Sequence, residues 1–464
     1  MKKNNSIISS LLILVWLSTV SCSSSDNSKT LITAKTSQNK GYEKISVSDY
    51  QRAENQLYAT TSTLIFGTVK QPKWLDENRL SYRVPTENGH QFVIANVKTD
   101  EKYLAFDHQA IAKALSSDEI IYQGEKLPFT RFKFNDDYTS ITFKLKKESY
   151  HCDLSLNQCK VVQSKPRFKG EILSPDGSQA AFIREYNLWV RNTKTFLETQ
   201  LTTDGIKHFG YATNNAGWAR SKTPVLLWSP DSKKITTFQH DSRKVGDMHL
   251  VSTDIGHPKL DSWKYPLPGD EHIFSLHRVV IDVVSKKVVR LKMAADAQRS
   301  TIMDHIYSRG KLLDAQWSDD SKSLAIVSVS RDHKQAILRI VNPNTGTVDT
   351  IMDEKVASFF ESGKDKVNWH YLSESNEILW FSQRSDWGHL YLFDLTTAKL
   401  KHSITQGEWN VLQVLNVDKS NRTLYFTGAG REQSDPYFQY FYSVNFDGSN
   451  LTLLTPEKAN HRIT

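Results

Sequence analysis

The stretch Trp228–Gln239 reads W-S-P-D-S-K-K-I-T-T-F-Q, and a second copy begins at Trp317 as W-S-D-D-S-K-S-L-A-I-V-S. A third copy, L-S-P-D-G-S-Q-A-A-F-I, runs from Leu173 to Ile183. Pro, Asp, Ser and Gly are the residues that tight turns favour. The apolar and small residues that follow alternate loosely, as they do in a strand. Each copy therefore predicts a turn that leads into a β-strand, and an aromatic residue before the turn is expected to be a buried anchor.

The same unit recurs along the chain at separations of roughly forty to sixty residues, a period typical of large repeats. Looser copies begin at Trp74, Phe134, Leu372 and Val417. The gap from Trp228 to Trp317 is about twice the shorter spacing, and a degenerate unit at Phe274–Leu291 could fill it. Repeats of several short strands indicate a β-propeller. We therefore predict an all-β fold with a seven- or eight-bladed propeller, eight being favoured, and keep a set of unrelated β-sandwiches as the alternative.

Composition agrees with a large β-rich core that is preceded by one short helix. The chain has 464 residues, of which 11% are aromatic, and helical patterns are scarce. In Ser48–Thr60, Ser48 and Gln51 are spaced as a capping box, and Tyr50 and Leu57 share one face of the predicted helix. The net charge of +8 comes from residues of both signs without a long basic block. This pattern predicts a solvated surface and no nucleic-acid partner.

The amino terminus has the pattern of an export signal. Lys2 and Lys3 precede the mostly apolar run Ile7–Val20, which leads into V-S-C at Val20–Cys22. We predict a signal peptide over residues 1–21 and a lipidated Cys22, followed by a flexible tether over residues 22–47. The expected location is the bacterial cell envelope, as an outer-membrane lipoprotein that faces the periplasm. An ordinary signal peptide with an incidental cysteine is the alternative.

Two further cysteines bracket a short predicted hairpin in Y-H-C-D-L-S-L-N-Q-C-K. An exported chain can keep a disulfide, and the two strand ends of a hairpin can bring Cys152 and Cys159 within reach of each other. Zinc bound with the help of His151 is the alternative, but three ligands in one hairpin make a poor closed site. We therefore predict a Cys152–Cys159 disulfide and no metal.

No sequence motif of a known catalytic centre is present. The chain contains no G-x-S-x-G, H-E-x-x-H, Walker loop or G-x-G-x-x-G. His389 in W-G-H-L and His272 in D-E-H lack a nameable catalytic partner. We therefore predict no catalytic residues in this chain and no cofactor.

An ordered set of phrases carries a family resemblance. It comprises N-L-W-V at Asn187, W-S-P-D-S at Trp228, W-K-Y-P-L-P-G-D-E at Trp263–Glu271, H-R-V-V-I-D at His277–Asp282, D-W-G-H-L-Y-L-F-D at Asp386–Asp394, and L-L-T-P-E-K-A-N-H from Leu453. From about Ser48 to its end the chain resembles the dipeptidyl peptidase IV branch of the prolyl oligopeptidase-like serine peptidases. The resemblance implies a propeller over residues 67–464 and a helical segment over residues 48–66 that packs on a C-terminal α/β-hydrolase domain. That domain, which carries the catalytic triad, is expected to be absent from this chain.

One departure from the family's pattern concerns substrate binding. The family holds the amino terminus of its peptide substrate with a Glu-Glu pair on a loop that, by position, should precede W-S-P-D-S. Here that segment, His208–Leu227, contains no acidic residue. Asn214, Asn215 and Trp218 are the candidate substrate-binding residues of this loop, although neutral amides cannot supply the missing charge. Glu185 or Asp204 could substitute from nearby loops, and an ordinary polar loop is the alternative.

The favoured interpretation is therefore a propeller that gates and binds peptide substrates for a hydrolase domain supplied in cis or in trans, with a membrane contact through lipid on Cys22. By itself such a chain is expected to be inactive. Two alternatives stay open: a stand-alone cell-envelope propeller that binds a protein or glycan, and an enzyme whose site is assembled in the propeller funnel.

Overall fold

The structure is a computed structural model that describes residues 44–162, 170–213, 221–253, 255–297, 307–308, 311–360 and 368–463. The chain divides into two compact units, Met1–Ser164 and Lys165–Thr464. Within the described ranges, no helix is long and apolar enough to cross a membrane.

The first unit contains two four-stranded antiparallel sheets in which each strand pairs with its neighbour in the chain. Their strands are β1 (Lys70–Trp74), β2 (Arg79–Thr86), β3 (Gly89–Asn96) and β4 (Glu101–Leu104), then β5 (Phe132–Phe134), β6 (Ser140–Leu145), β7 (Glu148–Asp153) and β8 (Gln158–Val162). The helical elements are α1 (Val47–Glu54), α2 (Tyr58–Thr61), α3 (His108–Leu115) and the 3₁₀-helices η1 (Ser62–Leu64) and η2 (Gly124–Lys126). The two sheets and α3 share one buried cluster that includes Phe92, Ile111 and Phe143.

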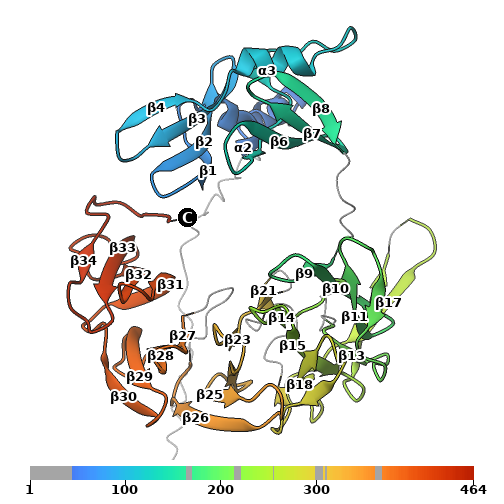
Figure 1. Ribbon diagram of the computed structural model, residues 1–464, viewed down its shortest axis with the longest axis vertical. Helices are drawn as coiled ribbons and strands as arrows, with labels where there is room; N and C mark the ends of the chain where they lie inside the picture. The colour runs from blue at the N-terminus through green and yellow to red at the C-terminus, as the bar shows by residue number, and fades with distance from the viewer. Residues whose placement is uncertain are drawn as a thin grey trace, which may run out of the picture. The chain divides into compact units, whose positions relative to one another are not determined.

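The second unit contains five sheets that follow one another in chain order (Figure 1). The first is β9 (Ile172–Leu173), β10 (Gln179–Arg184), β11 (Asn187–Asn192) and β12 (Glu198–Gln200). The second joins β13 (Phe209–Tyr211), β14 (Leu227–Trp228), β15 (Lys234–Asp241), β18 (Ser275–Asp282), β19 (Val288–Arg290) and β20 (Asp296–Ala297). The third is β23 (Ala315–Trp317), β24 (Leu324–Val329), β25 (Gln335–Val341) and β26 (Val348–Lys355). The fourth is β27 (His370–Leu372), β28 (Glu377–Ser382), β29 (His389–Asp394) and β30 (Lys399–Ser403). The fifth is β31 (Asn410–Asp418), β32 (Thr423–Ala429), β33 (Gln439–Asn445) and β34 (Thr452–Leu453).

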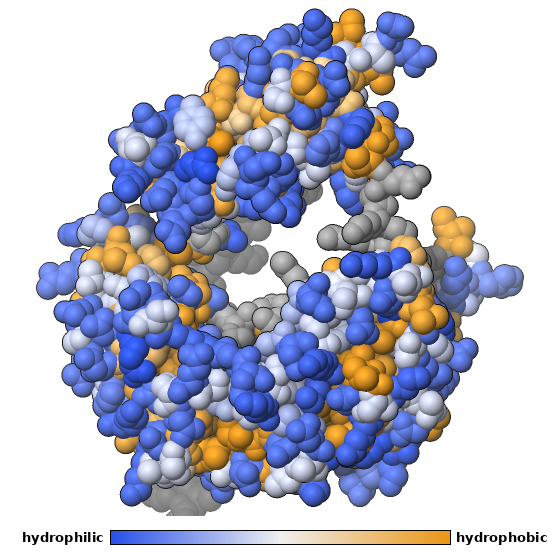
Figure 2. Space-filling view, viewed as in Figure 1, coloured by the Kyte–Doolittle hydropathy of each residue, from blue (hydrophilic) through white to orange (hydrophobic). Residues whose placement is uncertain are grey.

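Two hairpins stand outside these sheets, β16 (Asp247–Ser252) with β17 (Lys259–Lys264), and β21 (Tyr307–Ser308) with β22 (Lys311–Leu312). The β16–β17 hairpin interrupts the second sheet of its unit between β15 and β18. It carries exposed apolar side chains at Leu250, Val251, Ile255 and Leu260. Figure 2 shows hydrophobic colouring on this hairpin, at the right of the view.

The described residues thus form seven propeller-type blades, two in the first unit and five in the second. This count lies within the predicted range of seven or eight. The degenerate unit predicted at Phe274–Leu291 is not a blade of its own. Its strands β18 and β19 complete the sheet that β15 begins, with Ile235 opposite Ile281. The long β16–β17 insertion, rather than an extra blade, lengthens the spacing between Trp228 and Trp317.

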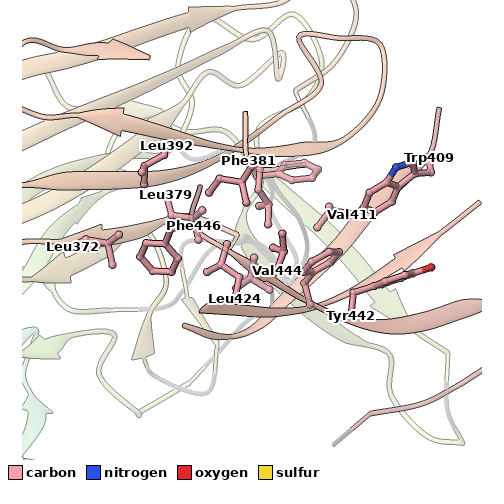
Figure 3. Close-up of a cluster of buried hydrophobic side chains, with 14 of the residues drawn as sticks. Leu372, Leu379, Phe381, Leu392, Trp409, Val411, Leu424, Tyr442, Val444 and Phe446 are labelled. Carbon is pink, nitrogen blue, oxygen red and sulfur yellow. The ribbon is translucent and has the colours of Figure 1, made fainter. Parts of the chain in front are cut away.

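Apolar clusters hold neighbouring blades of the second unit together. In Figure 3, Leu379 and Phe381 of β28 pack with Leu424 of β32 and Tyr442 of β33, so that the last two blades share one core. Similar clusters join each earlier blade of the unit to the next. Burial of one Leu or Phe side chain contributes about 1.5–3 kcal/mol, so these shared cores are the main stabilising term.

The middle strands of two inner blades of the second unit are buried on both faces because each of these blades lies between two others. All six residues of β28 are buried, as are the six central residues of β15. The sequence of such a strand does not need the strict alternation of apolar and polar residues that a half-exposed strand shows. This explains why the repeats alternate only loosely.

The repeated turn has the same internal hydrogen bond in three blades. The serine after the anchor residue donates its hydroxyl to the aspartate two positions later, in the pairs Ser174–Asp176 (2.6 Å), Ser229–Asp231 (2.6 Å) and Ser318–Asp320 (2.7 Å). The hydroxyl of Ser174 and the backbone N–H of Ser178 lower the pKa of Asp176 to about 2. The aspartate is therefore ionised at neutral pH and holds the turn closed.

The same turns also bond to one another across blades. A backbone N–H of one turn donates to a serine hydroxyl in the turn of the following blade, in the pairs Asp176–Ser232 (3.2 Å), Asp231–Ser321 (3.1 Å) and Asp319–Ser373 (3.3 Å). Ser232 and Ser321 both have a φ of +61°, which turns the side chain toward the preceding blade. The repeated motif thus links blades as well as reversing the chain.

The anchor prediction is confirmed where a preceding blade of the same unit exists. Trp228 is buried and donates from Nε1 to the carbonyl of Ile172, and Trp317 is buried and donates to the carbonyl of Leu227. The prediction is wrong for Trp74, which is 57% exposed, and the aliphatic Leu173 at the same place in its repeat is 51% exposed. Each of these two residues begins the first blade of its unit, so no preceding blade of that unit covers it.

The amino-terminal helix begins earlier than predicted and is shorter. Helix α1 starts after Ser46, and the capping box joins Ser46 to Asp49 instead of Ser48 to Gln51. The Asp49 carboxylate accepts the Ser46 backbone N–H at 2.9 Å, a charge-assisted bond that a neutral Gln side chain could not match. Helix α3 was not predicted, and Asp107 caps it by accepting the N–H groups of Gln109 and Ala110.

The predicted Cys152–Cys159 disulfide is confirmed. The two cysteines lie opposite each other on β7 and β8, with their sulfur atoms bonded to each other. The sulfurs are therefore not available as zinc ligands.

A buried carboxylate joins the last two blades. The side chain of Glu377 on β28 is only 3% exposed and contacts Lys401 of its own blade at 2.6 Å and Arg422 of the next blade at 2.9 Å. Burial by itself would raise the pKa of Glu377, but the hydrogen bonds from Arg422 and Lys401 outweigh this effect and lower it to about 2. Glu377 is thus ionised and neutralises two cations at this blade interface.

The links between turns can be tested with Ser232→Ala. The substitution removes the acceptor of the Asp176 N–H but keeps a residue with a Cβ at the same φ. We expect the free energy of unfolding to fall by about 1 kcal/mol, the usual net value of one hydrogen bond. Urea unfolding followed by tryptophan fluorescence measures this change. Ser420→Ala is the control, because the Ser420 hydroxyl has no hydrogen bond among the described residues, and an equal effect of both variants would contradict the interpretation.

The Glu377 cluster predicts a particular pH dependence. We expect Glu377→Gln to lower the free energy of unfolding by about 2 kcal/mol near neutral pH, since the charge-assisted hydrogen bonds from Lys401 and Arg422 are weakened. A lowered carboxyl pKa stabilises the fold above the ordinary value of 4.5, and this contribution is lost as the pH falls toward about 2. The difference between wild type and variant should therefore shrink on acidification. A constant difference in urea unfolding between about pH 6 and about pH 3 would argue against this role.

Candidate functional site

The predicted substrate loop is only partly described. Asn214, Asn215 and Trp218 lie outside the described residues, as does Cys22. Thr213 and Ser221 are the described residues on either side of this stretch, and both line a cavity of about 390 Å³ in the second unit.

Five segments of the chain line this cavity, and three of them supply most of its residues. The turn into β13 and the strand itself contribute Lys207, His208 and Gly210. The end of β15 contributes His240 and Ser242, and the end of β17 contributes Ser262, Trp263 and Lys264. The remaining lining residues are Tyr186, Thr213, Ser221 and Lys222. The β16–β17 insertion thus supplies one wall of the cavity.

Close packing in the sheet places Gly210 and His208 at the cavity. A Cβ atom on Gly210 would lie 2.9 Å from Cγ2 of Thr213 and 3.2 Å from Cβ of Tyr186, so only glycine fits here without a shift. The backbone N–H of Ser242 donates to the carbonyl of His208 at 2.8 Å, which fixes His208 beside β15.

Positive charge dominates the lining. Lys207 and Lys222 are exposed and form no ion pair among the described residues, while Lys264 pairs with Asp247 at 3.1 Å. Partial burial, followed by the nearby charges of Lys264 and Lys207, lowers the pKa of His208, and Asp247 opposes this shift only weakly. Among the described lining residues there is no carboxylate.

Neither acidic substitute that the sequence suggested lines the cavity. The carboxylate of Asp204 accepts the Tyr211 hydroxyl at 2.7 Å and pairs with Arg290 at 2.9 Å. Glu185 is exposed in the β10–β11 turn, and its neighbour Tyr186 reaches the cavity instead. No residue described here therefore reproduces an acidic anchor for a peptide amine at this position.

The two histidines that the sequence drew attention to have different surroundings. His389 is buried, with Nδ1 3.0 Å from the Thr405 hydroxyl and Nε2 2.9 Å from the carbonyl of Gly407, so both nitrogens are occupied in packing. His272 is exposed and lines a second cavity of about 460 Å³ with Asp241, Arg243 and Glu271.

A second exposed feature lies in the first unit. The segment from α1 to the start of β1 buries none of its helical residues. Its apolar side chains Val47, Tyr58, Leu64, Ile65 and Phe66 are all about half exposed or more. Exposed apolar side chains that follow one another like this are typical of interaction surfaces.

The known proteins to which this chain is similar are named as dipeptidyl peptidases or dipeptidyl-aminopeptidases. Residues 134–464 match the family described as the dipeptidyl peptidase IV (DPP IV) N-terminal region. A Neosartorya fischeri protein named "Probable dipeptidyl-aminopeptidase B" is 23% identical over 313 residues, which cover 61% of this chain and 32% of that protein. An Emericella nidulans protein named "Probable dipeptidyl peptidase 4" is 20% identical over 388 residues, covering 73% of this chain and 46% of that protein.

Among solved structures, that of Porphyromonas gingivalis dipeptidyl peptidase 4 is similar to this fold with a TM-score of 0.56 at 18% identity, covering 86% of this chain and 55% of that one. The chain spans between about a third and about half the length of these relatives. The family match extends from the second blade to the last residue and so covers five blades of the second unit as well. The chain therefore belongs to the family of dipeptidyl peptidase IV N-terminal regions.

Proposed function

We propose that this chain is the propeller of an exported dipeptidyl peptidase IV-like serine peptidase, and that it binds and gates peptide substrates for a hydrolase domain carried in cis or in trans. Family membership over residues 134–464 is the observation that carries the proposal. The cavity between β13, β15 and β17 is large enough for one or two side chains of a peptide and supports a binding role. The chain contains no G-x-S-x-G sequence, so the nucleophile is assigned to the hydrolase domain.

The exposed apolar segment at the amino terminus is the proposed docking site for that domain. Leu64 and Phe66 are 70% and 48% exposed, and α1 presents Tyr50 outward as well. Contact with a folded domain would remove this apolar area from water, at a gain of about 25 cal/mol for each Å² buried. The same segment was expected from the family resemblance to pack on a hydrolase domain.

Export and lipidation are part of the same proposal. The basic start, the apolar run and the V-S-C sequence ending at Cys22 are arranged as in a lipoprotein signal. We assign the chain to the outer membrane, facing the periplasm, with residues 22–47 as its tether. The Cys152–Cys159 disulfide is compatible with an oxidising compartment.

Reconstitution tests the enzymatic part of the proposal. We expect the DNA that follows the codon for Thr464, or a neighbouring gene, to encode a G-x-S-x-G hydrolase domain. The 464-residue chain should leave chromogenic dipeptide substrates uncleaved, and addition of the purified hydrolase domain should produce cleavage that a fluorophosphonate abolishes. Cleavage by the chain alone that resists the fluorophosphonate would contradict the proposal.

Within the reconstituted system, Leu64→Asp combined with Phe66→Asp should weaken binding of the hydrolase domain at least tenfold, because it places charge in the apolar contact. Both side chains are exposed, so the fold should be retained. Leu197→Asp combined with Val284→Asp is the matched control, since these side chains are also apolar and exposed. Equal binding by both double variants, measured by calorimetry, would exclude this segment as the docking site.

Lipidation is tested with Cys22→Ala. In cells fed a radiolabelled fatty acid, the wild-type chain should be labelled and recovered with outer membranes. The variant should be unlabelled and soluble in the periplasm, because its only acceptor thiol at the cleavage site is gone. Ser24→Ala is the control and should behave as wild type, whereas labelling of the Cys22→Ala variant would contradict the assignment.

A further inference from the structure

We propose that the cavity between β13, β15 and β17 binds a carboxylate, and that it selects peptides carrying an acidic side chain. The inference deepens the proposed function and rests on it for the choice of a peptide as ligand. Anion binding itself depends only on the described residues that line the cavity.

The cavity is positively charged, and its lysines come from separate segments of the chain. Lys207 precedes β13, Lys222 follows the predicted substrate loop and Lys264 ends β17, so three lysines from separate segments line one cavity. Like charges brought together by a fold repel one another, and a bound anion relieves that repulsion. An array of solvated surface lysines along one strand or helix would not converge in this way.

The positive charge of the cavity is only partly neutralised by the described residues around it. Asp247 pairs with Lys264 but leaves Lys207 and Lys222 without an ion pair among the described residues. A carboxylate placed between those two lysines would gain charge-assisted hydrogen bonds of the strong kind. The depressed pKa of His208, to which Lys264 and Lys207 contribute after burial, is a further sign of positive potential here.

The remaining lining residues add hydrogen-bond donors and aromatic rings to the cavity. Ser221, Ser242 and Ser262 add hydroxyl groups that can donate to an anion, and Trp263 and Tyr186 add aromatic rings that can pack on the carbon atoms of a peptide. A peptide amine would meet only cations and neutral groups among these residues. The volume of about 390 Å³ suits a short acidic segment and not a folded domain.

Peptide binding by calorimetry tests the inference in the full chain. The probes are three peptides of equal length with acetylated amino termini: one with two Glu and an amidated end, one with Gln in place of Glu and an amidated end, and the Gln peptide with a free carboxyl terminus. We expect the Glu peptide to bind at least tenfold more tightly than the amidated Gln peptide, and its affinity to fall as salt is raised. Tight binding of the third peptide instead would overturn the side-chain assignment and indicate capture of a terminal carboxylate.

The variant with Lys207→Gln and Lys222→Gln should lose at least tenfold in affinity for the Glu peptide and little for the Gln peptide. The control with Lys113→Gln and Lys399→Gln makes the same change in net charge at exposed lysines outside the cavity. Equal losses in both double variants would show that only the overall charge matters and would overturn the inference. Circular dichroism and thermal unfolding check that both variants are folded.

The outcomes separate this inference from the proposed function. If Glu and Gln peptides bind equally, peptide binding stands and acidic selectivity is wrong. If N-acetylglutamate binds in a manner sensitive to Lys207 and Lys222 but no peptide binds, the anion site stands and the peptide-binding function is wrong. If none of the probes binds, both are wrong.

Discussion

The hydrogen bonds from one repeated turn to the next align the first four blades of the second unit. A serine in the left-handed conformation, such as Ser232, accepts a backbone N–H from the turn of the preceding blade, and Trp228 donates its indole N–H back to that blade. The short motif therefore aligns two sheets while it reverses the chain. Apolar clusters between blades then supply most of the stabilisation, and middle strands such as β28 are buried on both faces.

Carboxylates in this fold are used mainly for structure. Asp176 closes a turn, Asp204 pairs with Arg290, and Glu377 neutralises two cations between blades. The cavity beside the predicted substrate loop is lined instead by lysine, histidine, hydroxyl-bearing and aromatic residues. This distribution separates the groups that hold the blades together from those available to a ligand, and it makes the site electropositive. Under the proposed function, a propeller that meets its peptide with cations should differ in substrate choice from one that meets it with acids.

Several features could not be predicted because they depend on what lies beside a residue in space. Trp74 and Trp228 have similar local sequences, but only Trp228 has a preceding blade in its unit to cover it. Phe274–Leu291 resembles a repeat, but its strands complete the sheet of β15. The helix begins at Ser46 because the Asp49 carboxylate makes a stronger cap than the Gln51 amide that the sequence pattern favoured. In each case the local sequence predicted the correct kind of secondary structure. It did not predict how exposed the tryptophan is, which sheet the strands join or where the helix starts.

From sequence alone, the all-β class, the repeated turn and strand, the Cys152–Cys159 pair and the family could be determined, because each depends on residues close in the chain or on a recurring phrase. The absence of acidic residues from His208–Leu227 was also visible there. Only the tertiary structure decided that Lys264, on an inserted hairpin, joins Lys207 and Lys222 at one cavity, and that Asp204 is already paired. The physical reason is that charge acts through space, and the distance between two side chains is set by the packing of sheets and not by their separation in sequence.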